Sequence, residues 1–74
     1  MEREEIRERL SRNRLSFVWL INQLEKRGVM TDKTEMSGAI SGSRKGPKVD
    51  LIIRESIAAL DEYEANYANA ANAQ

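Results

Sequence analysis

Residues 36–48 (MSGAISGSRKGPK) are mostly small and basic, and the basic part, residues 43–48, could bind an anion. Four side chains there can donate hydrogen bonds, namely Ser43, Arg44, Lys45 and Lys48. The dipeptide Gly46-Pro47 within this run is typical of a helix start, because proline is favoured at the first helical position. The free N–H groups of a helix N-terminus also bind phosphate. The pattern therefore favours binding of phosphate groups.

The charges of the chain are unevenly distributed. Twelve basic residues balance twelve acidic residues, so the net charge is zero. Residues 26–48 nevertheless hold six basic and two acidic residues, whereas residues 49–74 hold one basic and five acidic residues. Such asymmetry can give a neutral molecule one surface that faces a polyanion. The alternative interpretation is a solvated surface whose charges are merely uneven.

Enzymatic chemistry has little support in the sequence. The chain has no cysteine and no histidine, so it lacks a thiolate nucleophile and the commonest general base and metal ligand. The glutamates near the N-terminus alternate with arginines at helix-neighbour spacing, which is typical of a solvated helix face. The glycine-rich nucleotide-binding pattern that ends in Lys-Ser or Lys-Thr is also missing. We expect neither catalysis nor a cofactor or metal site.

Hydrophobic periodicity predicts one all-α domain with four helices. The expected helices cover about residues 2–12, 16–27, 33–41 and 47–64, and residues 65–74 form a frayed or disordered tail. The second helix has the clearest pattern, with apolar residues at i, i+3, i+4 and i+7 in Phe17, Leu20, Ile21 and Leu24. We expect Ser16 to cap this helix and Gly28 to follow its end.

The expected third helix is short and contains a glycine. Residues 32–35 (DKTE) match a capping box, in which Asp32 caps the helix and Glu35 reaches back. The apolar face consists of Met36, Ala39 and Ile40. A glycine inside a helix costs roughly 1 kcal/mol relative to alanine. Gly38 is therefore either the result of neutral drift or a position that something approaches closely, either an external partner or a neighbouring helix.

Three segments carry a resemblance to a known family. Residues 15–24 (LSFVWLINQL), 32–42 (DKTEMSGAISG) and 43–48 (SRKGPK) resemble the Cro/repressor type of helix-turn-helix domain of phage and bacterial regulators. The resemblance covers roughly residues 4–63 and implies a compact, lambda repressor-like fold of four to five helices. Structural roles would then belong to Leu20, Leu24, Met36, Ala39, Ile40 and Gly42.

The resemblance implies a function and assigns residues to it. The chain would be a repressor-like transcriptional regulator of phage or mobile-element origin that binds double-stranded DNA as a homodimer. The third helix would lie in the major groove, with base contacts from Lys33, Thr34, Ser37 and Gly38. Phosphate contacts would come from Ser43, Arg44, Lys45 and Lys48. If three to five of these groups contact phosphates, the logarithm of affinity should fall with the logarithm of salt concentration by about 0.9 per contact.

A second hypothesis assigns the same fold to protein binding. The domain would then be an antirepressor or modulator of another regulator, which the neutral net charge and the acidic fourth helix leave open. Candidate interface residues, for this role or for a dimer, are Val18, Trp19, Leu51, Ile52 and Tyr63. Trp19 has an alternative place, packed against the connector near Val29 and Met30.

The location of the protein is also an expectation from sequence. No apolar run approaches the ~18 residues of a membrane span, and the first ten residues are charged where a signal peptide is apolar. We therefore expect a cytoplasmic protein without a membrane partner.

Overall fold

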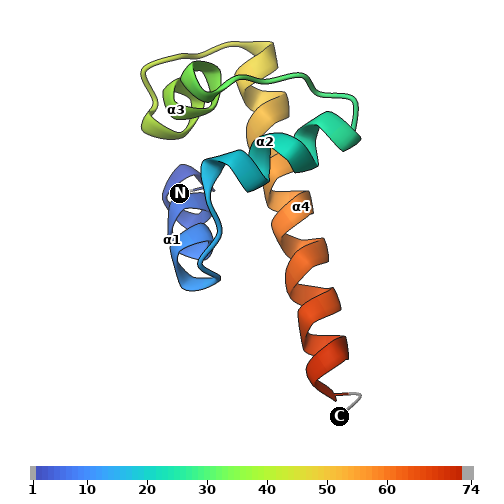
Figure 1. Cartoon of the computed structure of the whole chain (residues 1–74). Coiled ribbons are helices and arrows are strands. Elements are labelled where there is room, and N and C mark those ends of the chain that lie inside the picture. The colour runs from blue at the N-terminus through green and yellow to red at the C-terminus, as the bar shows by residue number, and fades with distance from the viewer. Residues whose placement is uncertain (1, 73–74) are drawn as a thin grey trace.

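Four α-helices make up the computed structural model, which describes residues 2–72 and the side chains up to residue 66. They are α1 (Glu2–Arg12), α2 (Phe17–Lys26), α3 (Lys33–Ser41) and α4 (Pro47–Asn72). α4 contacts each of the other three helices, and α3 also packs against α1 and α2 (Figure 1). The described residues contain no β-strand, so the predicted all-α class is confirmed.

The residues that flank α2 explain where it begins and ends. Ser16 has an extended backbone, and its side chain accepts a hydrogen bond from the Trp19 N–H at 3.2 Å, as expected for an N-cap. At the other end, the Gly28 N–H donates to the Glu25 carbonyl at 3.0 Å and the Val29 N–H donates to the Leu24 carbonyl at 2.8 Å. This is a Schellman motif, which requires the positive φ of +84° at Gly28.

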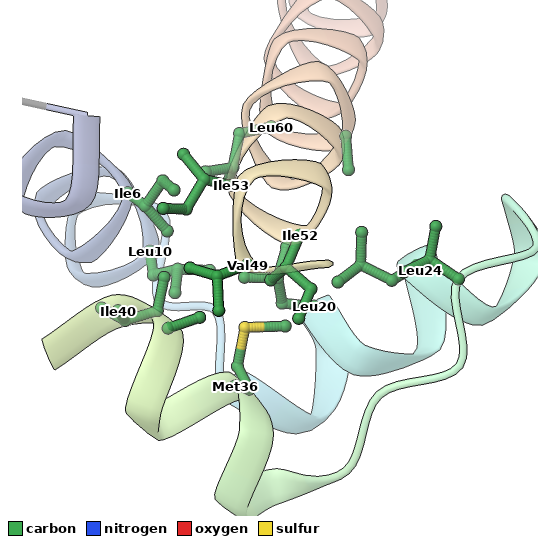
Figure 2. Packing of buried hydrophobic residues seen from close by; sticks show 13 residues of the cluster. Ile6, Leu10, Leu20, Leu24, Met36, Ile40, Val49, Ile52, Ile53 and Leu60 are labelled. Carbon is green, nitrogen blue, oxygen red and sulfur yellow. The ribbon is translucent and has the colours of Figure 1, made fainter. Parts of the chain in front are cut away.

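The core is a cluster of apolar side chains from all four helices (Figure 2). Its buried members are Ile6, Leu10, Leu20, Leu24, Val29, Met36, Ala39, Ile40, Val49, Ile52, Ile53, Ala59 and Leu60. Ile52 is 1% exposed, which makes its assignment as an interface candidate wrong. Its position in α4 follows Val49 by three residues, and this helical spacing turns both side chains toward the core.

α4 is longer than the sequence analysis predicts. The helix ends at Asn72 and not at about residue 64, so the segment assigned to a tail is helical over residues 65–72. Alanine is the best helix former, and this segment has four alanines and no glycine or proline. The absence of an apolar stripe therefore did not stop the helix. Residues 73–74, also assigned to the tail, lie outside the described residues.

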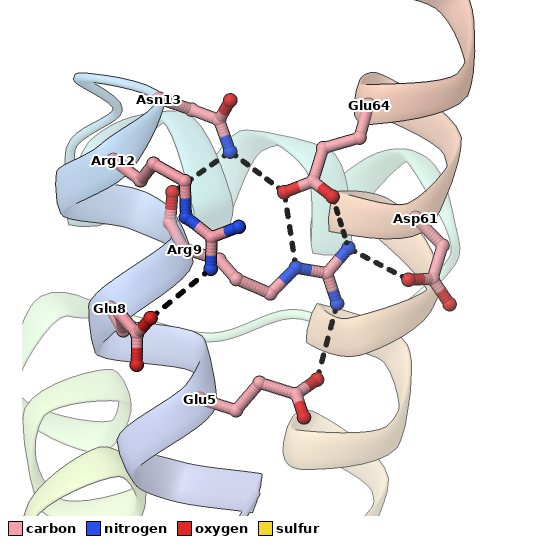
Figure 3. Close-up of polar contacts among 7 residues, drawn as sticks. All are labelled: Glu5, Glu8, Arg9, Arg12, Asn13, Asp61 and Glu64. Atoms are coloured by element: carbon pink, nitrogen blue, oxygen red, sulfur yellow. Dashed lines mark hydrogen bonds and ion pairs between the residues drawn. The ribbon is translucent and has the colours of Figure 1, made fainter.

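One arginine of α1 is buried against α4 (Figure 3). Arg9 is 8% exposed and donates hydrogen bonds to Glu64 at 3.0 and 3.1 Å, to Asp61 at 2.7 Å and to Glu5 at 3.2 Å. Asn13 donates a further bond to Glu64 at 2.8 Å. Bonds from Arg9 and Asn13 hold the pKa of Glu64 below its ordinary value, and the carboxylates raise the pKa of Arg9. The face of α1 predicted to be solvated thus includes a structural ion-pair cluster.

A buried hydroxyl in α4 gives a first prediction. Ser56 is fully buried, and its Oγ has no hydrogen-bond partner among the described residues. An unsatisfied buried polar group costs roughly 1–3 kcal/mol, and alanine also favours a helix. We expect Ser56→Ala to raise the free energy of unfolding by about 1 kcal/mol in urea titrations followed by circular dichroism. Ser11→Ala, at an exposed position of α1, is the control for helix propensity, and a loss of stability in Ser56→Ala would contradict the prediction.

Candidate nucleic-acid interface

The N-terminus of α3 is fixed by its cap and by α4. Asp32 accepts a hydrogen bond from the Glu35 N–H at 2.7 Å, which confirms the predicted cap. The Glu35 carboxylate lies 2.9 Å from Lys48 Nζ on α4. The bond from Lys48 is the main cause of a lowered pKa at Glu35, and the Asp32 backbone N–H contributes in the same direction.

The C-terminus of α3 is fixed by α1. Arg3 Nε donates a hydrogen bond to the Ala39 carbonyl at 2.9 Å, which satisfies one of the last carbonyls of the helix and places a cation at its negative end. Gly42 then reverses the chain with a φ of +88°, and its N–H donates to the Gly38 carbonyl at 3.1 Å. α3 is therefore held at both ends. No local pattern in the sequence indicates the role of Arg3, because its partner is 36 residues away.

The polar face of α3 is exposed and borders a hollow in the surface. Lys33, Thr34 and Ser37 are exposed, whereas Met36, Ala39 and Ile40 on the opposite face are buried. The hollow is lined by Phe17, Lys33, Thr34, Ser37, Gly38, Ser43 and Arg44. The structure thus groups six of the eight predicted DNA contacts. The other two, Lys45 and Lys48, line a second hollow together with Glu35 and the start of α4.

Gly38 is covered by the side chain of Arg44. A Cβ atom at residue 38 would lie 2.7 Å from Arg44 Cγ and 2.8 Å from Cδ, which is closer than real contacts of this kind. The Arg44 N–H also donates to the Gly38 carbonyl at 3.2 Å. Gly38 is consequently buried, so its assignment as a base contact is wrong. The three atoms nearest to this position all belong to Arg44, in the loop after α3.

Most acidic side chains of α4 are paired within the protein. Arg27, the residue that follows α2, lies 3.5 Å from Glu55 and 2.6 Å from Glu62, while Arg9 forms ion pairs with Asp61 and Glu64. In contrast, Lys33, Arg44 and Lys45 form no ion pair with any of the described residues. The described carboxylates therefore do not neutralise the positive charge around the two hollows, except at Lys48, which pairs with Glu35.

The remaining interface candidates are only partly exposed. The Trp19 ring stands edge-on to the Tyr63 ring of α4, with centroids 5.4 Å apart and an interplanar angle of 76°. Trp19 thus packs on α4 and against the apolar core. Val18 is 51% exposed, whereas Leu51 is half-buried against the core. Single exposed apolar residues are ordinary on protein surfaces.

The fold and the two hollows together describe a small all-α domain with cationic side chains on one helix and on the loop after it. No model of a protein family, no curated protein and no solved structure matches this chain. Within residues 2–72, the helices offer no segment long and apolar enough to cross a membrane.

Proposed function

We propose that the chain is a small sequence-specific DNA-binding regulator in which α2 and α3 form a helix-turn-helix and α3 enters the major groove. The observation that carries this proposal is the grouping of Lys33, Thr34, Ser37 and Arg44 around one hollow on the exposed face of α3. A recognition helix needs hydrogen-bonding side chains near its N-terminus and a rigid seat on its other face. α3 has both, because its buried face and both of its ends are fixed.

The loop and the start of α4 would lie along the DNA backbone. Lys45 is exposed and lies beside Gly46 and Pro47, so a phosphate there would meet a cation and the N-terminus of α4. Ser43 can donate a further hydrogen bond. We assign Lys48 to the packing of α3 against α4 because of its ion pair with Glu35.

Lys45→Ala tests the backbone contact. Each phosphate neutralised adds about −0.9 to the slope of log affinity against log salt. We expect Lys45→Ala to make this slope shallower by about 0.9 and to weaken binding to all duplexes equally. Fluorescence anisotropy with labelled random-sequence DNA measures the affinity, at chosen concentrations of 50 to 200 mM NaCl. Lys26→Ala, an exposed lysine that lines neither hollow, is the matched control and should leave the slope unchanged.

Lys33→Ala should act differently from Lys45→Ala, because base contacts carry the sequence information. We expect it to change the order of preferred duplexes in a selection from a random pool. The assignment of roles is wrong if Lys45→Ala alters preference and Lys33→Ala does not. Failure of the unmodified protein to bind any duplex at low salt would reject DNA binding and favour the alternative, a protein-binding modulator of another regulator.

We further propose that two copies bind a two-fold operator. A single small module buries only about 600–1,000 Å² of protein surface on DNA, which is little for a stable specific complex. Val18 is the most exposed apolar candidate for contact between the copies. A titration of duplex with protein, followed by sedimentation velocity, should give two chains per duplex.

A further inference from the structure

We infer that Arg44 reads a guanine base in the major groove and that Gly38 is the positioning residue that aims it, an inference that rests on the proposed DNA binding. The family resemblance assigns Arg44 to phosphate contact, because Arg44 follows α3 in a basic loop. In the structure its side chain lies against Gly38 of α3. The turn at Gly42 brings the Arg44 backbone back to the Gly38 carbonyl, so the side chain starts beside the last turns of α3.

The stem of Arg44 lies on α3 itself. Its Cγ, Cδ and Nε would lie 2.7, 2.8 and 3.1 Å from a Cβ at residue 38, so only a glycine leaves this path open. Three groups also bind the Gly38 carbonyl, namely the N–H groups of Gly42 and Arg44 and the Ser41 hydroxyl. These bonds fix the loop relative to the helix. The Arg44 side chain therefore lines the same hollow as Lys33, Thr34 and Ser37, and it also lines the second hollow beside Lys45.

The chemistry of this hollow favours an arginine as its main base reader. Thr34 and Ser37 are short, and Lys33 presents a single point charge, so none of these side chains offers a planar pair of donors. Arginine does, and its bidentate bond to O6 and N7 of guanine is the commonest specific contact in the major groove. Arg44 forms no ion pair with the described residues, so its donors are not occupied by a carboxylate.

The experiment is a selection of bound duplexes from a random pool, carried out with the full chain and three variants. Arg44→Lys keeps the charge but loses the planar fork. Gly38→Ala keeps Arg44 but forces its stem off α3, and alanine favours the helix. The unmodified protein should require a guanine at one position of each half-site. Both variants should lose roughly 10- to 100-fold of this preference at the same position, with the salt dependence retained.

The double variant Gly38→Ala with Arg44→Lys distinguishes the positioning of Arg44 by Gly38 from a general loss of DNA binding. If Gly38 acts only through Arg44, the double variant should lose no more guanine preference than Arg44→Lys alone. Circular dichroism and thermal unfolding show whether each variant is folded. If Gly38→Ala does not fold, Arg44→Lys still tests the inference, because Arg44 is exposed and its substitution should leave the fold intact. Selection of the same guanine by Arg44→Lys would overturn the inference and leave DNA binding intact. No enrichment by the unmodified protein would instead reject the proposed function, and the inference with it.

Discussion

Replacing Met36 with alanine will lower the free energy of unfolding by about 3 kcal/mol, within the roughly 2–5 kcal/mol range for removal of a large buried side chain. Met36 is fully buried and reaches from α3 toward the side chains of α2 and α4 (Figure 2). Its α3 neighbours in the core, Ala39 and Ile40, cannot fill the space. A domain of this length has a total stability of roughly 4–11 kcal/mol, so the substitution will remove roughly a quarter to three-quarters of it.

The adjacent Ser37→Ala variant is the matched control, because the same helix carries Ser37 on its exposed face. Surface substitutions of this kind usually change stability by about 0.5 kcal/mol or less. Urea unfolding at 25 °C, a chosen condition, measures both variants. Equal losses of stability in the two would contradict the packing of α3 described above.

Replacing Arg9 with methionine will lower the free energy of unfolding at neutral pH by about 2 kcal/mol. The methionine keeps most of the apolar stem but removes the cation that Glu64 and Asp61 share (Figure 3). Breaking a buried ion pair costs roughly 3–5 kcal/mol. The expected loss is smaller because Asp61 is 64% exposed, so water solvates it after the substitution.

At low pH, Arg9→Met and the unmodified protein should have similar free energies of unfolding. The pKa of Glu64 is lowered in the folded state from its ordinary value of 4.5, so its ion pair contributes fully above about pH 4.5 and is lost as the pH falls through the lowered pKa. Unfolding free energies measured from pH 7 down to pH 3, as chosen conditions, should therefore converge. Arg12→Met removes an exposed pair with Glu8 and should cost about 0.5 kcal/mol or less.

The sequence predicts best the features that depend on neighbours in the chain. The cap at Asp32, the turn at Gly28 and the apolar face of α3 all follow from spacings of three or four residues, and the structure confirms each of them. Apart from Gly38, five of the residues that the resemblance assigns to DNA contact line one hollow, because they lie on one short helix and the loop after it. Their role in DNA binding stays a prediction.

The sequence could not predict the contacts between distant residues. Arg3 and Arg9 look alike among the charges of α1, yet one caps α3 and the other is buried against α4, at separations of 36 and 55 residues. Gly38 was ambiguous for a different reason. Its partner lies only six positions away, but the turn at Gly42 that brings them together determines the contact. In α4, residues 65–72 were assigned to a tail because of their low complexity, although their alanine content favours a helix.

The contact between Gly38 and Arg44 restricts how this surface can evolve. A side chain at residue 38 and a long side chain at residue 44 compete for the same space, so a change at one position alters what is tolerated at the other. We therefore expect the two positions to covary among homologous chains. Lineages that acquire a larger residue at position 38 should carry a shorter residue at position 44, so that a new binding preference arises through paired substitutions.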